Sequence, residues 1–171
     1  VPRLLVQDRV AVILLSSPAP FTHNGYLPPP TLAWLEQALR QVPADLPVII
    51  SLHHPVLGDP RHLDQYPLFL ELISRPAFHV RLVLSGHNHE RRFWERNGIW
   101  FSGVPKLPKD RSYDLVRIQA DRIVLSRKDL GASPVPYLEI PLAPPARPLL
   151  PEVSLSSGPG PVGDAQLLLK F

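Results

Sequence analysis

Residues 80–89 read Val-Arg-Leu-Val-Leu-Ser-Gly-His-Asn-His. The apolar first half of this stretch predicts a strand that is buried on both faces, as in a layered α/β sheet. Two imidazoles, His87 and His89, follow on a turn directly after the strand. Because Gly86 lets the backbone bend sharply, these two side chains can diverge towards two neighbouring metal ions. The stretch therefore predicts both an α/β fold and a candidate metal site.

The segments upstream of this stretch repeat the pattern. Residues 10–15 and 48–52 are apolar runs that predict two more buried strands. Apolar residues at helical spacing predict a helix over 31–42, with Thr31 as its N-cap. A second helix is expected within 63–73, where a Pro suits the first turn. The resulting order, β-α-β-α-β, is typical of an α/β fold.

The segments downstream predict antiparallel strands. Residues 92–96 and 99–102 flank Asn97-Gly98, which is a strong signal for a hairpin with a two-residue turn. A second hairpin is expected over 113–127. Beyond it the chain is rich in Pro, which favours irregular structure. We therefore divide the chain into a folded portion, 1–131, and a Pro-rich irregular tail, 132–171.

Composition narrows the function. The chain has 171 residues, enough for one domain with a sizeable core. It has no Cys, so a metal must be held by His, Asp, Glu or Asn. The net charge of +3 is too weak to indicate nucleic-acid binding, and the apolar runs are too short to span a bilayer. With no signal peptide visible, we expect a cytoplasmic protein that binds neither membrane nor nucleic acid.

The histidines are the candidate functional residues. In open α/β sheets, ligands bind beyond the carboxyl ends of the strands. His53 and His54 follow one predicted strand, as His87 and His89 follow the next. His53 could thus join one of the ions at His87 and His89, since neutral imidazole is a common metal ligand. The histidines without this placement are assigned to surface or packing roles: His23, His62 and His79.

Three segments carry a family resemblance: Leu-Ala-Trp-Leu-Glu at 32–36, Val-Ile-Ile-Ser-Leu-His-His-Pro at 48–55 and Val-Leu-Ser-Gly-His-Asn-His at 83–89. In this order they resemble the calcineurin-like metallophosphoesterases, and most closely the class III cyclic nucleotide phosphodiesterases. The resemblance covers about residues 10–128. It implies a four-layer α/β/β/α sandwich that ends in antiparallel hairpins. It also implies two-metal hydrolysis of a small phosphoester, in which an activated hydroxide attacks phosphorus.

The resemblance also implies roles for individual residues. His53 and His87 would bind one ion, and His89 would bind the other. His54 would lie behind the ligands or face the substrate, and Asn88 would lie near the phosphate, so these two are the candidate catalytic residues. The two ions could be Mn, Fe or Zn, because imidazole and oxygen ligands do not choose among them by affinity alone.

Two arginines follow the last of these histidines, and their role is open. Arg91 and Arg92 are either solvated charges of the hairpin or groups that attract an anionic substrate.

The family's first-half motifs are absent: Asp-x-His, Gly-Asp-x-x-Asp and Gly-Asn-His-Asp/Glu. The dipeptides Gly58-Asp59 and Gly163-Asp164 do not fit them, because neither follows a predicted strand. We therefore expect this chain to be the C-terminal half of the enzyme, with an incomplete metal centre. Alone it should bind at most one metal weakly and hydrolyse little. The expected partners are the missing N-terminal half or further copies of the chain.

Two alternatives stay open. The chain could be a catalytically inactive truncated phosphoesterase, or a binding module that keeps a partial His site. It could also be a mononuclear metal-binding protein that uses His53, His87 and His89 alone.

Overall fold

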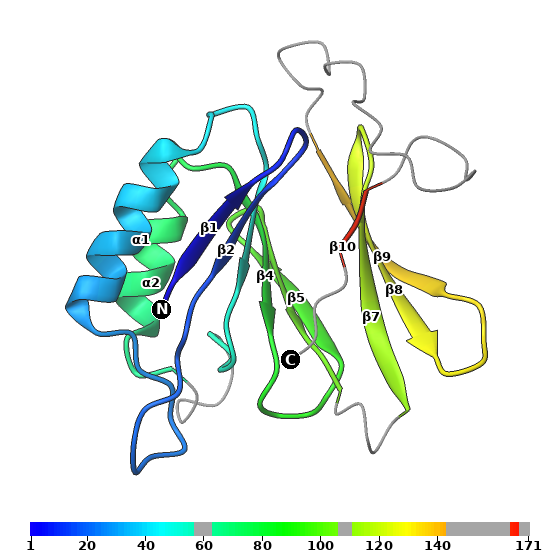
Figure 1. Ribbon diagram of the computed structural model, residues 1–171, viewed down its shortest axis with the longest axis horizontal. Helices are drawn as coiled ribbons and strands as arrows, with labels where there is room; N and C mark the ends of the chain where they lie inside the picture. The colour runs from blue at the N-terminus through cyan, green and yellow to red at the C-terminus, as the bar shows by residue number, and fades with distance from the viewer. Residues whose placement is uncertain (57–62, 106–110, 143–164, 168–171) are drawn as a thin grey trace.

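The computed structural model describes residues 1–56, 63–105, 111–142 and 165–167. These residues form two helices and ten strands, arranged as two sheets with the helices on one outer face (Figure 1). The elements are β1 (Arg3–Val6), β2 (Ala11–Leu14), α1 (Pro29–Gln41), β3 (Val48–Ser51), α2 (Tyr66–Ile73), β4 (Val80–Ser85), β5 (Arg92–Arg96), β6 (Ile99–Gly103), β7 (Ser112–Ile118), β8 (Arg122–Asp129), β9 (Val135–Pro141) and β10 (Ala165–Leu167).

The larger sheet has the strand order β1-β2-β3-β4-β6-β5. Its centre is parallel, because β2, β3, β4 and β6 all run in one direction, and its two edge strands are antiparallel to their neighbours. The smaller sheet is antiparallel, with the order β10-β7-β8-β9. Since β3 and β4 are parallel neighbours, their carboxyl ends meet at one edge of the larger sheet.

Two hydrophobic cores hold the layers together. Alternate side chains of β3 point to opposite faces, so Val48 and Ile50 pack under the helices while Ile49 packs against the smaller sheet. The same alternation places Val83 of β4 in the first core and Leu82 in the second. Strands that serve two cores are apolar on both faces, which explains the nearly continuous apolar runs in the sequence.

These observations confirm a mixed α/β fold with antiparallel hairpins. Strands occupy the three apolar runs that predict them, and the hairpin at Asn97-Gly98 forms as expected. Asn97 and Gly98 both have positive φ, at 56° and 76°, as a two-residue hairpin turn requires. In the described residues both helices pack on the larger sheet, which gives three layers (Figure 1). The fourth layer of the expected sandwich stays a prediction.

Three strands depart from the expectations. β9 and β10 both lie within 132–171, where we expect an irregular tail. β9 pairs antiparallel with β8, and β10 pairs antiparallel with β7, at the two edges of the smaller sheet. An edge strand tolerates Pro136 and Pro141 because one row of its backbone groups needs no partner. β1 also escapes the sequence analysis, since its largely exposed side chains do not alternate in polarity. Residues 143–164 and 168–171 lie outside the described residues.

The first helix begins earlier than expected. α1 starts at Pro29, with Pro28 in the capping position and no side-chain cap, so the assignment of Thr31 as the N-cap is wrong. Proline is favoured in the first turn because its missing N–H is not needed there and its φ suits a helix. Pro67 lies in the first turn of α2 as predicted. Neither helix of the described residues has the length and apolar character needed to cross a membrane.

The core between the sheets gives a test of this packing. Leu82 is fully buried there, and Leu82→Ala should lower the free energy of unfolding by about 2–5 kcal/mol through the cavity it leaves. Leu68 on α2 is 57% exposed, so Leu68→Ala should change the free energy of unfolding by less than about 0.5 kcal/mol. Urea unfolding followed by circular dichroism measures both. Equal losses in the two variants would contradict the packing described here.

Candidate metal centre

The candidate site lies where the parallel strands β3 and β4 end. The hydrogen-bond ladder between them continues past the strands, because Leu52 N donates to Leu84 O at 3.0 Å and Gly86 N donates to His53 O at 3.0 Å. These two bonds bring the segment after β3 against the turn after β4. His53 and His54 therefore lie close to His87. The sequence analysis expects His53 and His87 to share an ion, His89 to bind the other ion, and His54 to lie behind the ligands or to face the substrate.

Three imidazoles form a close group at this edge. One ring nitrogen from each of His53, His54 and His87 lies within 4.8 Å of the others. His87 Nδ1 is 3.3 Å from His53 Nε2. Two imidazole nitrogens bound to one tetrahedral zinc lie about 3.3–3.4 Å apart, given Zn–N bonds of about 2.0–2.1 Å. The contact between His53 and His87 is within hydrogen-bond distance, and the same spacing also fits two ligands of one metal ion.

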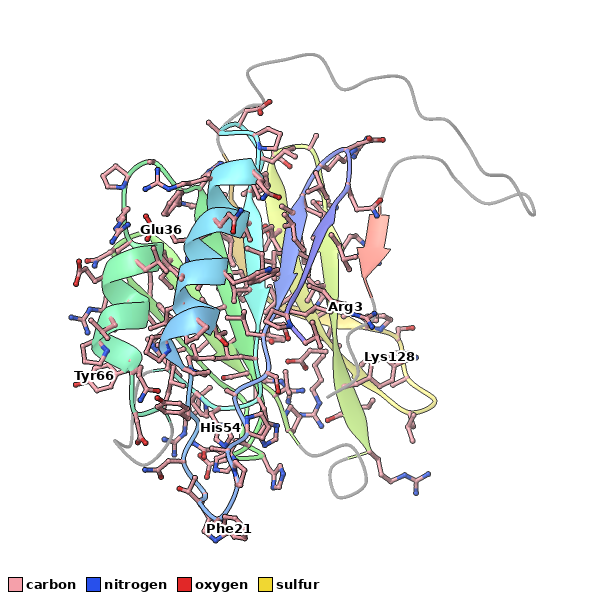
Figure 2. All side chains as sticks on the ribbon, turned by 60° about the vertical axis from the view of Figure 1, so that its left-hand side comes forward. Arg3, Phe21, Glu36, His54, Tyr66 and Lys128 are labelled. Atoms are coloured by element: carbon pink, nitrogen blue, oxygen red, sulfur yellow. The ribbon has the colours of Figure 1, made fainter. Side chains whose placement is uncertain are left out.

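His54 is the buried member of this group. Its backbone N–H donates to Ser17 Oγ at 3.1 Å, and its Nδ1 lies 3.0 Å from the same oxygen. Gly25 packs against the ring so closely that a Cβ at position 25 would lie 2.6 Å from His54 Cγ. Figure 2 shows His54 at the end of the molecule where the loop bearing Phe21 turns. Ser17 and Gly25 lie at the two ends of that loop, and both fix His54.

The turn after β4 is strained. His87 and His89 have φ of 65° and 56°, in the left-handed region that residues with a Cβ rarely adopt. Asn88 N donates to Gly86 O at 2.8 Å, so a three-residue turn closes around His87. A strained backbone at a cluster of metal-ligating side chains is a common mark of a functional site.

The electrostatics of the group favour uncharged imidazoles. Burial lowers the pKa of His53, and the neighbouring charge of His89 lowers it further. A lower pKa keeps His53 neutral at neutral pH, which is the form that binds a metal. In the described part of the chain, no carboxylate belongs to the group.

The predicted site residues are placed as follows. His53 and His87 lie together, and His54 joins them, whereas His89 is not part of the three-residue group. Asn88 lies on the same turn. The metal-binding and catalytic roles of all five residues stay predictions. His62 and Asp59 lie outside the described residues.

The two arginines after the turn differ in their surroundings. Arg92 forms an exposed ion pair with Glu90 at 2.6 Å, as expected for a solvated charge of the hairpin. Arg91 is mostly buried instead, and its Nη2 lies 2.7 Å from Asp114 Oδ1. The sequence analysis does not single out Asp114, because a pair 23 residues apart, with Arg91 on a turn and Asp114 on β7, leaves no local pattern. Ser17 could have been found, because it follows the apolar run that forms β2 just as the histidines follow β3 and β4.

The chain is similar in sequence to parts of two known proteins. No model of a protein family matches it. Over 99 residues, 54% of its length, it is 34% identical to a 3′,5′-cyclic-nucleotide phosphodiesterase of Nostoc sp.. Over 100 residues, 55% of its length, it is 37% identical to a probable cyclic nucleotide phosphodiesterase of Synechococcus sp.. The matched regions span only 36% and 38% of these two relatives.

A solved structure also resembles this one. The chain matches GAP50, the anchor in the inner membrane complex of Plasmodium, with a TM-score of 0.57 and 17% sequence identity. The match covers 90% of this chain and 60% of the other. At this identity the likeness concerns the fold alone. The printed names of the two sequence relatives are those of a cyclic nucleotide phosphodiesterase and a probable one, and the structural likeness supports the arrangement of the sheets and helices.

Proposed function

We propose that this chain belongs to a metal-dependent phosphoester hydrolase of the calcineurin-like type, similar to the class III cyclic nucleotide phosphodiesterases. The observation that carries the proposal is the convergence of His53, His54 and His87 at the carboxyl ends of two adjacent parallel strands. The names of the two sequence relatives support a phosphodiester, such as a cyclic nucleotide, as the substrate of the complete protein.

His53 and His87 are the residues that would hold a metal ion. Their facing nitrogens have the spacing of two ligands on one ion, and the lowered pKa of His53 keeps its imidazole neutral. A divalent metal at this place supplies a Lewis acid that activates water and neutralises phosphate oxygens. Mn, Fe and Zn all suit imidazole ligands. In the proposed dinuclear centre, His89 holds the second ion.

His54 is proposed as a hydrogen-bond donor to the substrate. Ser17 Oγ already accepts the backbone N–H of His54, so the hydroxyl proton is available to Nδ1. In that tautomer Nε2 carries the proton, and it can donate to an oxygen of the phosphate. Asn88, on the turn beside it, is proposed to orient the same phosphate.

The proposed reaction needs ligands beyond those described here. Three neutral imidazoles leave the charge of two dications uncompensated, and a pair of ions about 3.5–4 Å apart needs a bridging group. The proposal therefore requires carboxylates from outside the described residues, supplied by another part of the complete protein or by a partner chain. The imidazole-only group also favours the second candidate function, a binding module that holds one metal without hydrolysis.

The remaining features of the proposal follow the family that the chain resembles. The complete enzyme would be a four-layer sandwich that acts on a small phosphoester. We propose the cytoplasm as its location.

Metal binding tests the site directly. The metal-free chain should bind up to one equivalent of zinc or manganese in equilibrium dialysis. Removing one of the paired nitrogens, in His53→Ala or His87→Ala, should reduce binding below detection. His23 is exposed and apart from the group, so His23→Ala serves as the matched control and should bind like the wild type. A wild-type chain that binds neither metal would refute the proposed metal centre.

Hydrolysis tests whether the imidazoles suffice. With excess manganese or zinc, the chain alone should hydrolyse bis(p-nitrophenyl) phosphate only slightly, because the described residues supply no carboxylate to the imidazole group. Rapid turnover that depends on His87 would contradict the need for further ligands. It would still support a phosphodiesterase.

The contact between Ser17 and His54 gives a further prediction. Ser17→Ala leaves the buried N–H of His54 unpaired and should lower the free energy of unfolding by about 1–3 kcal/mol. The neighbouring Ser16 is exposed, so Ser16→Ala should leave it within about 0.5 kcal/mol of the wild type. Urea unfolding compares the two. An unchanged free energy of unfolding in Ser17→Ala would show that this hydroxyl does not hold His54.

A further inference from the structure

The turn that carries His87 needs support from the rest of the molecule. His87 and His89 both adopt a left-handed backbone, which is unfavourable for residues that carry a Cβ. Such a conformation persists only when its surroundings over-determine it. Residues 86–91, which join β4 to β5, must therefore be held at both ends.

Contacts within the larger sheet fix the backbone of this turn. At its start, Gly86 N donates to His53 O. Near its end, Glu90 O lies so close to Gly103 of β6 that a Cβ on Gly103 would be 3.1 Å away. These contacts position the two ends of the turn along the larger sheet. Neither of these contacts connects the turn to the smaller sheet.

The side chain of Arg91 connects the turn to the smaller sheet. Its Nη2 and Nε donate to Asp114 Oδ1 at 2.7 and 3.3 Å. Asp114 belongs to β7, so this ion pair ties the turn to the smaller sheet. The side chain of Asp114 is 3% exposed and that of Arg91 is 19% exposed, so water screens the pair far less than it screens the surface pairs of the molecule.

A second layer of contacts fixes Asp114 itself. Tyr137 of β9 donates its hydroxyl to Asp114 Oδ2 at 2.7 Å, and the guanidinium of Arg91 lies 5.5 Å from the centre of the Tyr137 ring. Ser102 of β6 lies 3.3 Å from the same hydroxyl. Burial, and then the charge of Asp114, raise the pKa of Tyr137, so the phenol stays protonated and remains a donor. Both oxygens of Asp114 are therefore bonded.

We propose that Asp114 is a positioning residue for His87: by holding Arg91, it fixes the strained turn and keeps the two facing nitrogens of His53 and His87 at metal-binding distance. The ion pair affects the geometry of the site more than the stability of the fold. The attraction between two buried charges is largely offset by the free energy needed to remove both from water. The role in metal binding rests on the proposed function. The effect on the turn does not.

Two measurements test the positioning role of Asp114 separately from the proposed metal-dependent function. The first is hydrogen exchange in the metal-free protein, read at residues 86–91. Asp114→Asn should speed exchange there at least about 10-fold and leave the helices unchanged. The matched control is Asp129→Asn on β8, whose ion pair with Arg127 has the same length of 2.7 Å but is exposed. This control should leave the turn as it is.

The second measurement is metal affinity, by competition dialysis with zinc and by the visible spectrum of the cobalt form. Asp114→Asn should weaken zinc binding about 10–100-fold and alter the cobalt spectrum, as loss of an outer contact does in metal sites. In the Arg91→Ala background it should have no further effect, because the coupling runs through Arg91. If the losses of zinc affinity in Asp114→Asn and Arg91→Ala add up in the double variant, Asp114 does not act through Arg91 and the proposal is wrong.

The outcomes are distinct. If the wild type binds no metal, the proposed function fails, and hydrogen exchange still decides the positioning role. If Asp114→Asn changes neither the turn nor the affinity, the positioning role is wrong. Should Asp114→Asn fail to fold, Tyr137→Phe decides, because it removes one hydrogen bond and keeps the ion pair. It should show a smaller effect of the same kind, and an unaltered turn would overturn the proposal.

Discussion

The parallel pairing of β3 with β4 is the constraint on which the candidate site depends. Two backbone hydrogen bonds extend that pairing beyond the strands, from Leu52 to Leu84 and from Gly86 to His53. They fix how the two histidine-bearing segments lie relative to each other. Had the strands been antiparallel neighbours, their carboxyl ends would lie at opposite edges of the sheet. The imidazoles would then be separated by the length of the strands.

The parts of the fold that could be predicted from the sequence are those with strong local patterns. β3 and β4 serve two cores and are apolar at most positions, and the hairpin at Asn97-Gly98 needs a turn that few residue pairs allow. β9 could not be predicted in the same way, because its prolines normally argue against a strand. Only its edge position, which depends on tertiary pairing with β8, makes them acceptable.

The candidate site also has some features that the sequence predicts and others that it does not. His53, His54 and His87 could be found because each follows a buried strand, and parallel strands bring such positions together. That His89 is not one of the three grouped residues could not be predicted, because the direction of each side chain on this turn depends on the backbone φ angles of the turn. The contact of Arg91 with Asp114 also has no sequence signal, because it joins two sheets whose packing is decided by the whole core. Local patterns locate the ligand atoms, and distant contacts decide their geometry.

Gly25 shows how a distant contact constrains the sequence. Its φ lies outside the left-handed region, so its own backbone does not require glycine. The requirement comes from the ring of His54, which occupies the space that a Cβ would need. The two positions are therefore expected to covary: among homologous chains, a side chain should become tolerable at position 25 only where position 54 has lost its imidazole. Selection on one residue of the cluster thus extends to a residue 29 positions away that carries no chemistry of its own.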